Sequence, residues 1–261
     1  MTLIDTHTHL FAEQFDEDRA EVVRAAIGQG VEKLFLPNID STTSAAMDAL
    51  AEAFPEHCYP MMGIHPSSIK SNYKEELAHA ERALFAEGAN YYGVGETGLD
   101  YYWDTTFVAE QKESLAQHAA WAKTLDLPII LHTRDSFDDN YAIMRNAQDG
   151  RLKGIFHCFG GSLEEAKKVM DLGFLMGIGG VVTFKNSGQQ LRDVLKEVPL
   201  ESLVLETDSP YLAPHPNRGQ RNESSWITLV VQKLAEVKEL DVAEVARVTT
   251  ENAMNLFGLE R

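Results

Sequence analysis

Residues 3–9 have the sequence Leu3-Ile4-Asp5-Thr6-His7-Thr8-His9, in which a short apolar run passes into alternating polar side chains. The pattern predicts a strand over Leu3 to Thr6 that ends in two histidines. Seven more β-rich runs follow along the chain, and segments with helical periodicity separate them. They are Lys33 to Pro37, Tyr59 to Ile64, Tyr91 to Gly95, Pro128 to Leu131, Gly154 to Phe156, Phe174 to Ile178 and Leu203 to Glu206.

The segments between these runs carry signals of helix beginnings and ends. Apolar residues at helical spacing over residues 22–27 stop before two glycines, as at a helix C-terminus. Ser162 followed by Glu165 is a capping-box pattern that opens a helix, and Asp241 with Glu244 repeats it near the end of the chain. Strands therefore alternate with helices.

Alternating strands and helices imply parallel strand pairing through right-handed crossovers. Eight such units in about 250 residues are the usual size of a closed barrel. Since no linker, repeat or low-complexity tract marks a boundary, we expect an α/β fold with one (β/α)8 TIM-barrel domain over residues 1–261. The alternative is an open, doubly wound sheet.

Composition excludes several classes of protein. A formal net charge of −17 argues against a broad basic surface for long nucleic acid, so an anionic substrate must be gripped locally. Cys58 and Cys158 are far apart in a chain too large to need a disulfide framework, which suggests a reducing compartment. No apolar stretch approaches the ~18 residues of a membrane helix. We expect a soluble, cytoplasmic monomer with no membrane or protein partner.

Polar residues with metal-binding side chains recur where the predicted strands end. His7 and His9 point the same way because side chains alternate along a strand. The carboxyl ends of barrel strands meet at one face, so residues after different strands should converge there. The predicted set is His7, His9, Glu96, His132, His157 and Asp208.

Imidazole and carboxylate ligands without thiolates suit zinc, manganese or related divalent ions. Six donors are too many for one open tetrahedral site and suit two ions that share a bridging carboxylate. The competing interpretation is that several of the histidines only cap strands through hydrogen bonds.

Several motifs together make the chain resemble, from end to end, the TatD-type metal-dependent deoxyribonucleases, a branch of the amidohydrolase-like barrel enzymes. They are Asp5-Thr6-His7-Thr8-His9-Leu10, Gly63-Ile64-His65-Pro66, Gly95-Glu96-Thr97-Gly98-Leu99-Asp100-Tyr101, His132-Thr133-Arg134-Asp135, His157-Cys158-Phe159, Glu206-Thr207-Asp208-Ser209-Pro210-Tyr211-Leu212 and Asn217-Arg218-Gly219.

The resemblance implies two divalent ions (Zn²⁺, Mg²⁺ or Mn²⁺) with Glu96 as the bridge. It assigns one ion to His7, His9, Glu96 and Asp208, and the other to Glu96, His132 and His157. It also implies hydrolysis of DNA phosphodiesters at an end or on a single strand, as an exonuclease, in DNA repair or in clearing damaged DNA.

Four residues are candidates for catalysis. Asp208 is the expected base for the attacking water, with Glu206 in reserve or acting only as a salt bridge or backbone cap. His65 has no metal partner in this scheme, so it either donates to a phosphate or leaving group or is structural. Arg134 could hold phosphate with its guanidinium fork, or else pair with a neighbouring aspartate, Asp135 or Asp100.

Three further residues are candidates for substrate binding. Arg218, in a loop after the last strand, contacts phosphate or lies in solvent. Tyr101 and Trp103, with Tyr102 between them, follow Glu96 and either stack on bases or pack against the rim.

Two other functions stay open. The same metals could cleave an amide, a lactone or an aminoacyl ester on tRNA, because function depends on the loops of a shared barrel. A binding or scaffold protein with a decayed site is the second alternative, and the intact ligand set argues against it.

Overall fold

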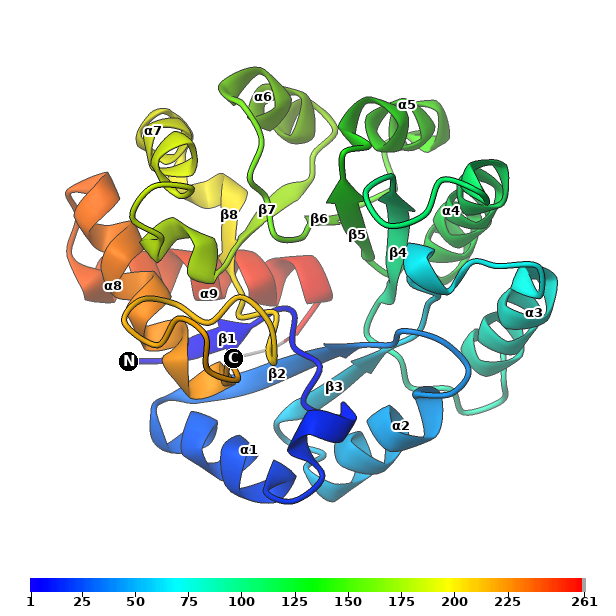
Figure 1. The fold of residues 1–261 in the computed structure, drawn as a ribbon, viewed down its shortest axis with the longest axis horizontal. Helices are drawn as coiled ribbons and strands as arrows, with labels where there is room; N and C mark the ends of the chain where they lie inside the picture. The colour runs from blue at the N-terminus through cyan, green and yellow to red at the C-terminus, as the bar shows by residue number, and fades with distance from the viewer. Residues whose placement is uncertain (260–261) are drawn as a thin grey trace.

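Eight short strands run parallel to their neighbours through the described residues, 1–259, of the computed structural model (Figure 1). They form one run of three and one of five, each in chain order. The strands are β1 (Leu3–Asp5), β2 (Val31–Pro37), β3 (Cys58–Met61), β4 (Val94–Asp100), β5 (Ile129–Arg134), β6 (Gly154–Phe156), β7 (Leu175–Ile178) and β8 (Leu203–Leu205).

Backbone hydrogen bonds join the two runs of strands at both of their edges. Between β3 and β4, Tyr92 donates to Pro60 at 2.9 Å and Gly95 to Met62 at 2.9 Å. Between β8 and β1, Thr6 donates to Leu205 at 3.0 Å. The sheet therefore closes on itself, which confirms the predicted barrel and excludes the open sheet.

Helices surround the barrel and follow the strands in turn, as Figure 1 shows. The predicted capping box is confirmed, because the Ser162 hydroxyl accepts from the Glu165 backbone and the Glu165 carboxylate accepts from the Ser162 backbone. The α-helices are α1 (Arg19–Gly28), α2 (Ser44–Ala53), α3 (Tyr73–Leu84), α4 (Val108–Leu125), α5 (Phe137–Ala147), α6 (Leu163–Asp171), α7 (Gln189–Glu197), α8 (Ile227–Lys238) and α9 (Val242–Phe257).

The last helix, α9, closes the end of the barrel opposite the site. It begins at Val242 after the N-cap Asp241, whose side chain accepts from the Ala243 backbone. The predicted capping box is confirmed only in its N-cap, because the Glu244 carboxylate accepts from Arg247 instead. Its Phe257 ring stacks on Phe35 of β2 at 3.7 Å between centroids. Other inward-facing strand residues pack in the same cluster, namely Ile4, Met61, Ile130, Ile155 and Val204. Apolar side chains therefore fill the end of the barrel that α9 covers, which leaves the carboxyl ends of the strands for polar groups.

Two predicted strand boundaries are wrong in a way that matters for the site. Glu96 was expected just after a strand, but β4 begins at Val94 and continues to Asp100; likewise β5 continues through His132 to Arg134. The polar half of each strand is paired, with Gly98 opposite His132. A side chain on Gly98 would meet the His132 carbonyl oxygen at 2.1 Å, so this glycine lets the two strands approach.

Candidate metal centre

The six predicted ligands come together at one end of the barrel. His7 and His9 follow β1, His157 follows β6, and Asp208 lies just beyond β8. Glu96 and His132 point inward from within β4 and β5 rather than from beyond them. The convergence that the sequence predicted is therefore present, although two of its members were misplaced relative to their strands.

The carboxylate of Glu96 stands at the middle of this group. Its Oε2 atom lies 3.2 Å from Nε2 of His7 and 3.3 Å from Nε2 of His9. The same two nitrogens face Oδ1 of Asp208 at 3.8 and 3.6 Å. One oxygen of Glu96 therefore faces the donors that the sequence assigned to one ion.

The other oxygen of Glu96 faces a different set of histidines. Oε1 lies 3.0 Å from Nδ1 of His132, 3.1 Å from Nε2 of His157 and 3.4 Å from Nε2 of His65. The two oxygens of one buried carboxylate are thus divided between two groups of imidazoles, which is the arrangement expected of a ligand that bridges two ions.

The donors fit divalent cations better than they fit one another. Nε2 of His7 and Nε2 of His9 lie 3.2 Å apart and both face the same carboxylate oxygen. If both nitrogens carry a proton, two donors oppose each other, and if neither does, three lone pairs converge, as they would on a cation. Within the described chain, the ion-pair partners of Glu96 are all histidines. Burial would raise the pKa of Glu96, yet His65, His7 and His157 hold it well below its ordinary value, so the carboxylate is ionised.

Asp208 differs from Glu96 in both position and acidity. It adopts a left-handed backbone conformation (φ 57°), and its backbone donates to the His7 carbonyl at 2.9 Å, which turns its carboxylate over the site. Burial raises the pKa of Asp208 to about 6, against the opposing effects of His157 and His9. A carboxylate of this kind can exchange a proton near neutral pH.

Asp100, which the sequence analysis did not assign, holds His132 from behind. Its Oδ2 lies 2.9 Å from Nε2 of His132, while Nδ1 of the same ring faces Glu96. Asp100 is four residues beyond Glu96 on the same strand, so the two side chains share a face. Because side chains repeat every two residues on a strand face, the four-residue spacing from Glu96 was the sequence signal that could have revealed Asp100.

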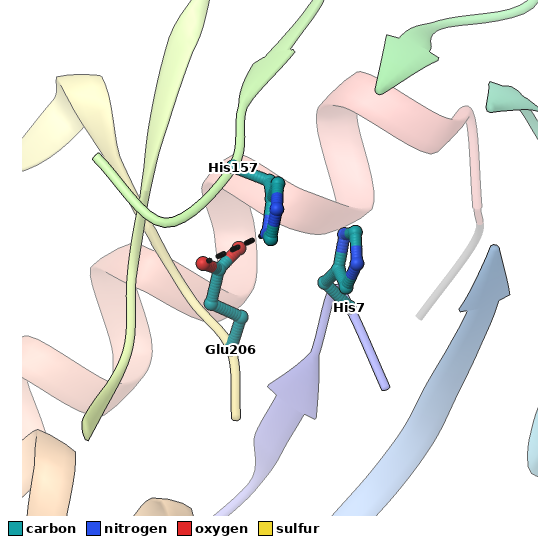
Figure 2. Close-up of side chains that lie close together, drawn as sticks. All are labelled: His7, His157 and Glu206. Atoms are coloured by element: carbon teal, nitrogen blue, oxygen red, sulfur yellow. Dashed lines mark ion pairs between the residues drawn. The ribbon is translucent and has the colours of Figure 1, made fainter. Parts of the chain in front are cut away.

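Glu206 lies beneath the histidines rather than over the site. Its Oε1 accepts from the Cys158 backbone at 2.5 Å and lies 3.5 Å from Nδ1 of His157. Figure 2 shows this carboxylate beside His157, with the His7 ring stacked against that of His157. This position agrees with the backbone-cap and salt-bridge role that was the alternative for Glu206.

Asp5 is a second unassigned residue that supports the ligands. One oxygen accepts from the backbone of Thr207 at 3.0 Å and from that of His7 at 3.3 Å. The other accepts from the Thr207 hydroxyl at 2.6 Å. Asp5 therefore ties the segment that carries His7 to the segment that carries Asp208.

Comparison with known proteins places the chain among relatives that share this arrangement of strands. The family model described as TatD related DNase matches residues 4–258. The chain belongs to the TatD family of metal-dependent hydrolases. It is 40% identical over 256 residues to the uncharacterized metal-dependent hydrolase YabD of Bacillus subtilis, covering 98% of each chain.

Two further relatives bear on structure and activity. The crystal structure of YJJV, a TatD homolog from Escherichia coli, has a TM-score of 0.92 and 31% identity, covering 99% of this chain and 98% of that one. The protein of Pantoea ananatis named 3'-5' ssDNA/RNA exonuclease TatD is 31% identical over 261 residues, with 98% of this chain and 100% of the relative covered.

His65 in this TatD-family chain is oriented as a hydrogen-bond donor. It is the N-cap of a 3-10 turn over Pro66–Ser68, and its Nδ1 accepts from the Ser67 backbone at 3.1 Å. In the neutral ring the proton then lies on Nε2, the nitrogen that faces Glu96 and His132. Buried His118 of α4 fixes this turn by accepting from the Ile64 backbone at 3.1 Å.

Arg134 stands at the rim against two aromatic rings. Its guanidinium lies 3.8 Å from the Tyr102 ring centre and 5.3 Å from that of Trp103, so neither predicted ion pair, with Asp135 or with Asp100, is formed. Tyr102 and Trp103 are 56% and 69% exposed, and Trp103 lines the cavity over the histidines. Tyr101 does not join them, because its hydroxyl donates to Asp139 at 2.7 Å and its ring packs on the core.

Arg218 also packs against an aromatic ring, 3.6 Å from the centre of Phe184 in the loop after β7. Arg192 of α7 supports that loop through bonds to the Val182 and Phe184 carbonyls. Arg218 is therefore an exposed residue stacked on Phe184, as the solvent alternative expected, and it does not line the cavity over the histidines.

A cavity of about 680 Å³ opens over the histidines and is lined by Glu96, Asp208 and Trp103 among others. A second, of about 670 Å³, shares Arg134 and His157 with it and extends between α5 and α6. Asp135, Asp138, Asp139 and Glu165 also line the second cavity, where Asp138 pairs with Lys168 and Asp139 with Lys112. Among residues 1–259, no helix is both long and apolar enough to cross a membrane.

Proposed function

We propose that this chain is a single-domain nuclease that hydrolyses DNA phosphodiester bonds at an end or on a single strand. The observation that carries the proposal is the division of the Glu96 oxygens between two groups of imidazoles, with Asp208 over one of them. The Pantoea relative named as a single-strand exonuclease supports the choice of substrate.

Two divalent ions, Zn²⁺, Mg²⁺ or Mn²⁺, when bound, would neutralise charge on the phosphoryl oxygens and lower the pKa of a bound water. His7, His9, Glu96 and Asp208 would hold one ion. Glu96, His132 and His157 would hold the other. Asp100 would orient the ring of His132 by accepting a hydrogen bond from the nitrogen that faces away from Glu96.

Asp208 is our candidate for the base that accepts the proton of the attacking water. In the metal-free protein burial raises its pKa to about 6, so the carboxylate is ionised at neutral pH. With one oxygen on an ion, its other oxygen would be free to accept the proton. Glu206 remains a weaker candidate, since it lies beneath the histidines. His65 carries its proton on the nitrogen that faces the site, so it can donate to a phosphoryl or leaving oxygen.

Arg134 and Trp103 are our candidates for holding the substrate beside the ions. A guanidinium stacked on aromatic rings keeps its N–H groups free at the edge for a phosphate, and the exposed indole offers a face for a base. Arg218, packed on Phe184 in the loop after β7, would contact a phosphate further along the bound DNA strand. Tyr101, engaged with Asp139, is the weakest of these candidates.

One observation favours the alternative, an amide, lactone or aminoacyl-ester hydrolase with the same ions. The cavity between α5 and α6, which continues from the site, is lined by four carboxylates, and two of them, Asp138 and Asp139, pair with lysines. The remaining negative charge disfavours a polyanion there. A long nucleic acid strand would therefore have to leave the site by another route.

A substrate panel with metal control separates these functions. Chelator-treated protein would be given Mg²⁺, Mn²⁺ or Zn²⁺ and then 5'- or 3'-labelled oligonucleotides, single- and double-stranded, a plasmid, a lactone, an N-acyl amide and an aminoacyl ester. The proposal expects stepwise shortening of labelled single strands that requires added metal. Turnover of the lactone, amide or aminoacyl ester with intact oligonucleotides would establish the alternative instead.

A further inference from the structure

Beneath the candidate metal centre lies a second cluster of buried polar atoms, formed by His7, His157 and Glu206 (Figure 2). One ring nitrogen of each histidine and one oxygen of the carboxylate lie within 4.8 Å of one another. All three side chains are at most 5% exposed. The cluster belongs to the side of the rings that faces away from Glu96.

Several atoms of this cluster have unmet hydrogen-bonding capacity. Nδ1 of His7, Nδ1 of His157 and Oε2 of Glu206 are buried and have no hydrogen-bond partner within the described residues, 1–259. Nε2 of each ring faces Glu96. If Nε2 binds metal, a neutral imidazole carries its proton on Nδ1, which makes both Nδ1–H groups donors. A buried donor without an acceptor destabilises the folded protein. Glu206 is the nearby acceptor: its Oε1 lies 3.5 Å from Nδ1 of His157, and a nitrogen of His7 lies within 4.8 Å of one of its oxygens.

We propose that Glu206 is a positioning residue that accepts hydrogen bonds from both His7 and His157 and so orients one ligand of each ion. The two rings are already stacked, 3.8 Å apart and 12° from parallel, so a single carboxylate can serve both. The inference rests on the proposed two-metal function, because it concerns residues assigned to different ions. Glu206 would then contact the Nδ1 atoms of His7 and His157, while Glu96 faces the Nε2 atoms of the same two rings.

Gly177 of β7 supplies an independent reason to regard the position of Glu206 as specific. A methyl group at Gly177 would lie 2.1 Å from Oε2 of Glu206, so the carboxylate fills space that only glycine leaves free. Two residues further on, a methyl group at Gly179 would meet Cγ of Glu206 at 3.5 Å, an ordinary contact. The chain therefore offers one variant that displaces the carboxylate and a matched one that does not.

The test measures metal affinity rather than turnover. Glu206→Gln, Gly177→Ala and Gly179→Ala would be titrated with Zn²⁺ in competition with a chromophoric chelator, and the thermal midpoint of each metal-free protein would be recorded. We expect Glu206→Gln and Gly177→Ala to weaken Zn²⁺ binding about 10–100-fold, as for other residues that orient metal ligands, and Gly179→Ala to bind as the wild type does. The double variant Glu206→Gln/Gly177→Ala should bind no more weakly than Glu206→Gln, since both act on one group.

A merely structural Glu206 would lower the thermal midpoint and leave Zn²⁺ affinity within twofold of the wild type, which would overturn the proposal. If Glu206→Gln does not fold, Gly177→Ala and the wild type decide. In the Zn²⁺-loaded wild type, ¹⁵N-resolved spectra should show slowly exchanging Nδ1–H protons on His7 and His157, and unprotonated Nδ1 atoms would contradict the inference. Because none of these readouts needs a substrate, they stand or fall separately from the nuclease proposal.

Discussion

Nε2 of His132 lies 2.9 Å from Oδ2 of Asp100, on the edge of the ring opposite the nitrogen that faces Glu96. Burial would raise the pKa of Asp100, but the bond to His132 and two backbone donors lower it to about 2. The carboxylate is thus ionised at any working pH and fixes which nitrogen of His132 carries the proton. An Asn at position 100 offers a weaker acceptor that can also turn its amide toward the ring.

For Asp100→Asn we therefore expect a 10–100-fold loss of metal affinity or of kcat/KM with little change in fold. Asp104→Asn is the matched control, since Asp104 lies in the loop that follows Asp100 and pairs with Lys70 instead. Chelator competition and steady-state rates measure the two quantities. Equal effects of both variants would show that Asp100 only stabilises the loop after β4, whose Tyr102 and Trp103 backbones it accepts from.

Asp208→Asn should keep the fold and lower turnover by about 10²–10⁴-fold, because an amide cannot accept the proton from water. Asp135→Asn provides the control: Asp135 also has a left-handed backbone (φ 55°), which Asn tolerates, and it is exposed at the rim. Rates at saturating metal and circular dichroism spectra are the measurements. Normal turnover by Asp208→Asn would remove Asp208 from the role of base.

The stacked rim predicts a difference between large and small substrates. Arg134→Ala and Trp103→Ala should each raise KM for a single-stranded oligonucleotide about tenfold or more. Arg134→Ala loses a phosphate contact, and Trp103→Ala loses base stacking on an aromatic ring, which contributes ~1–3 kcal/mol. For Trp103→Ala, KM for a small phosphodiester should not change. Phe85→Ala removes an exposed aromatic that does not line the cavity and serves as control. An unchanged oligonucleotide KM in Trp103→Ala would exclude stacking.

His118 predicts a pH dependence of stability that is separate from the site chemistry. Burial lowers its pKa to about 4, and the neutral ring donates to Ser114 and accepts from Ile64. The unfolded chain takes up a proton near pH 6.5 and the folded chain does not, so this contribution is complete above pH 6.5 and is lost as pH falls toward 4. It amounts to at most about 3 kcal/mol.

Urea unfolding of chelator-treated protein at pH 7 and pH 4 measures this term. The wild type should lose roughly 3 kcal/mol more than His118→Gln over that interval, while His215→Gln, at an exposed histidine, should follow the wild type. Parallel losses in wild type and His118→Gln would mean that the ring is protonated in the folded state.

The sequence predicted the convergence of His7, His9, Glu96, His132, His157 and Asp208 because a barrel brings the carboxyl ends of its strands together. It misplaced Glu96 and His132 because the polar, glycine-containing half of β4 does not look like a strand. That half is ordered by pairing to β5, where Gly98 lies against His132, and propensity carries no information about such a contact.

The supporting residues were harder to predict, for different reasons. Asp100 could have been found by counting along the strand from Glu96. His118 could not, since nothing in α4 indicates that this one position meets the Ile64 backbone. Tyr101 and Arg134 show the same limit: side-chain partners at the rim, Asp139 for one and Tyr102 for the other, depend on how adjacent loops pack.

The central claim is that Glu96 bridges two ions, and a metal titration tests it most directly. Chelator-treated wild type and Glu96→Ala would be titrated with Zn²⁺ by calorimetry, with bound metal counted after dialysis. We predict two equivalents in the wild type and at least tenfold weaker binding of both in Glu96→Ala, because each group of imidazoles loses one oxygen. A wild type that binds one equivalent, or a variant that loses one ion and holds the other unchanged, would contradict the bridge.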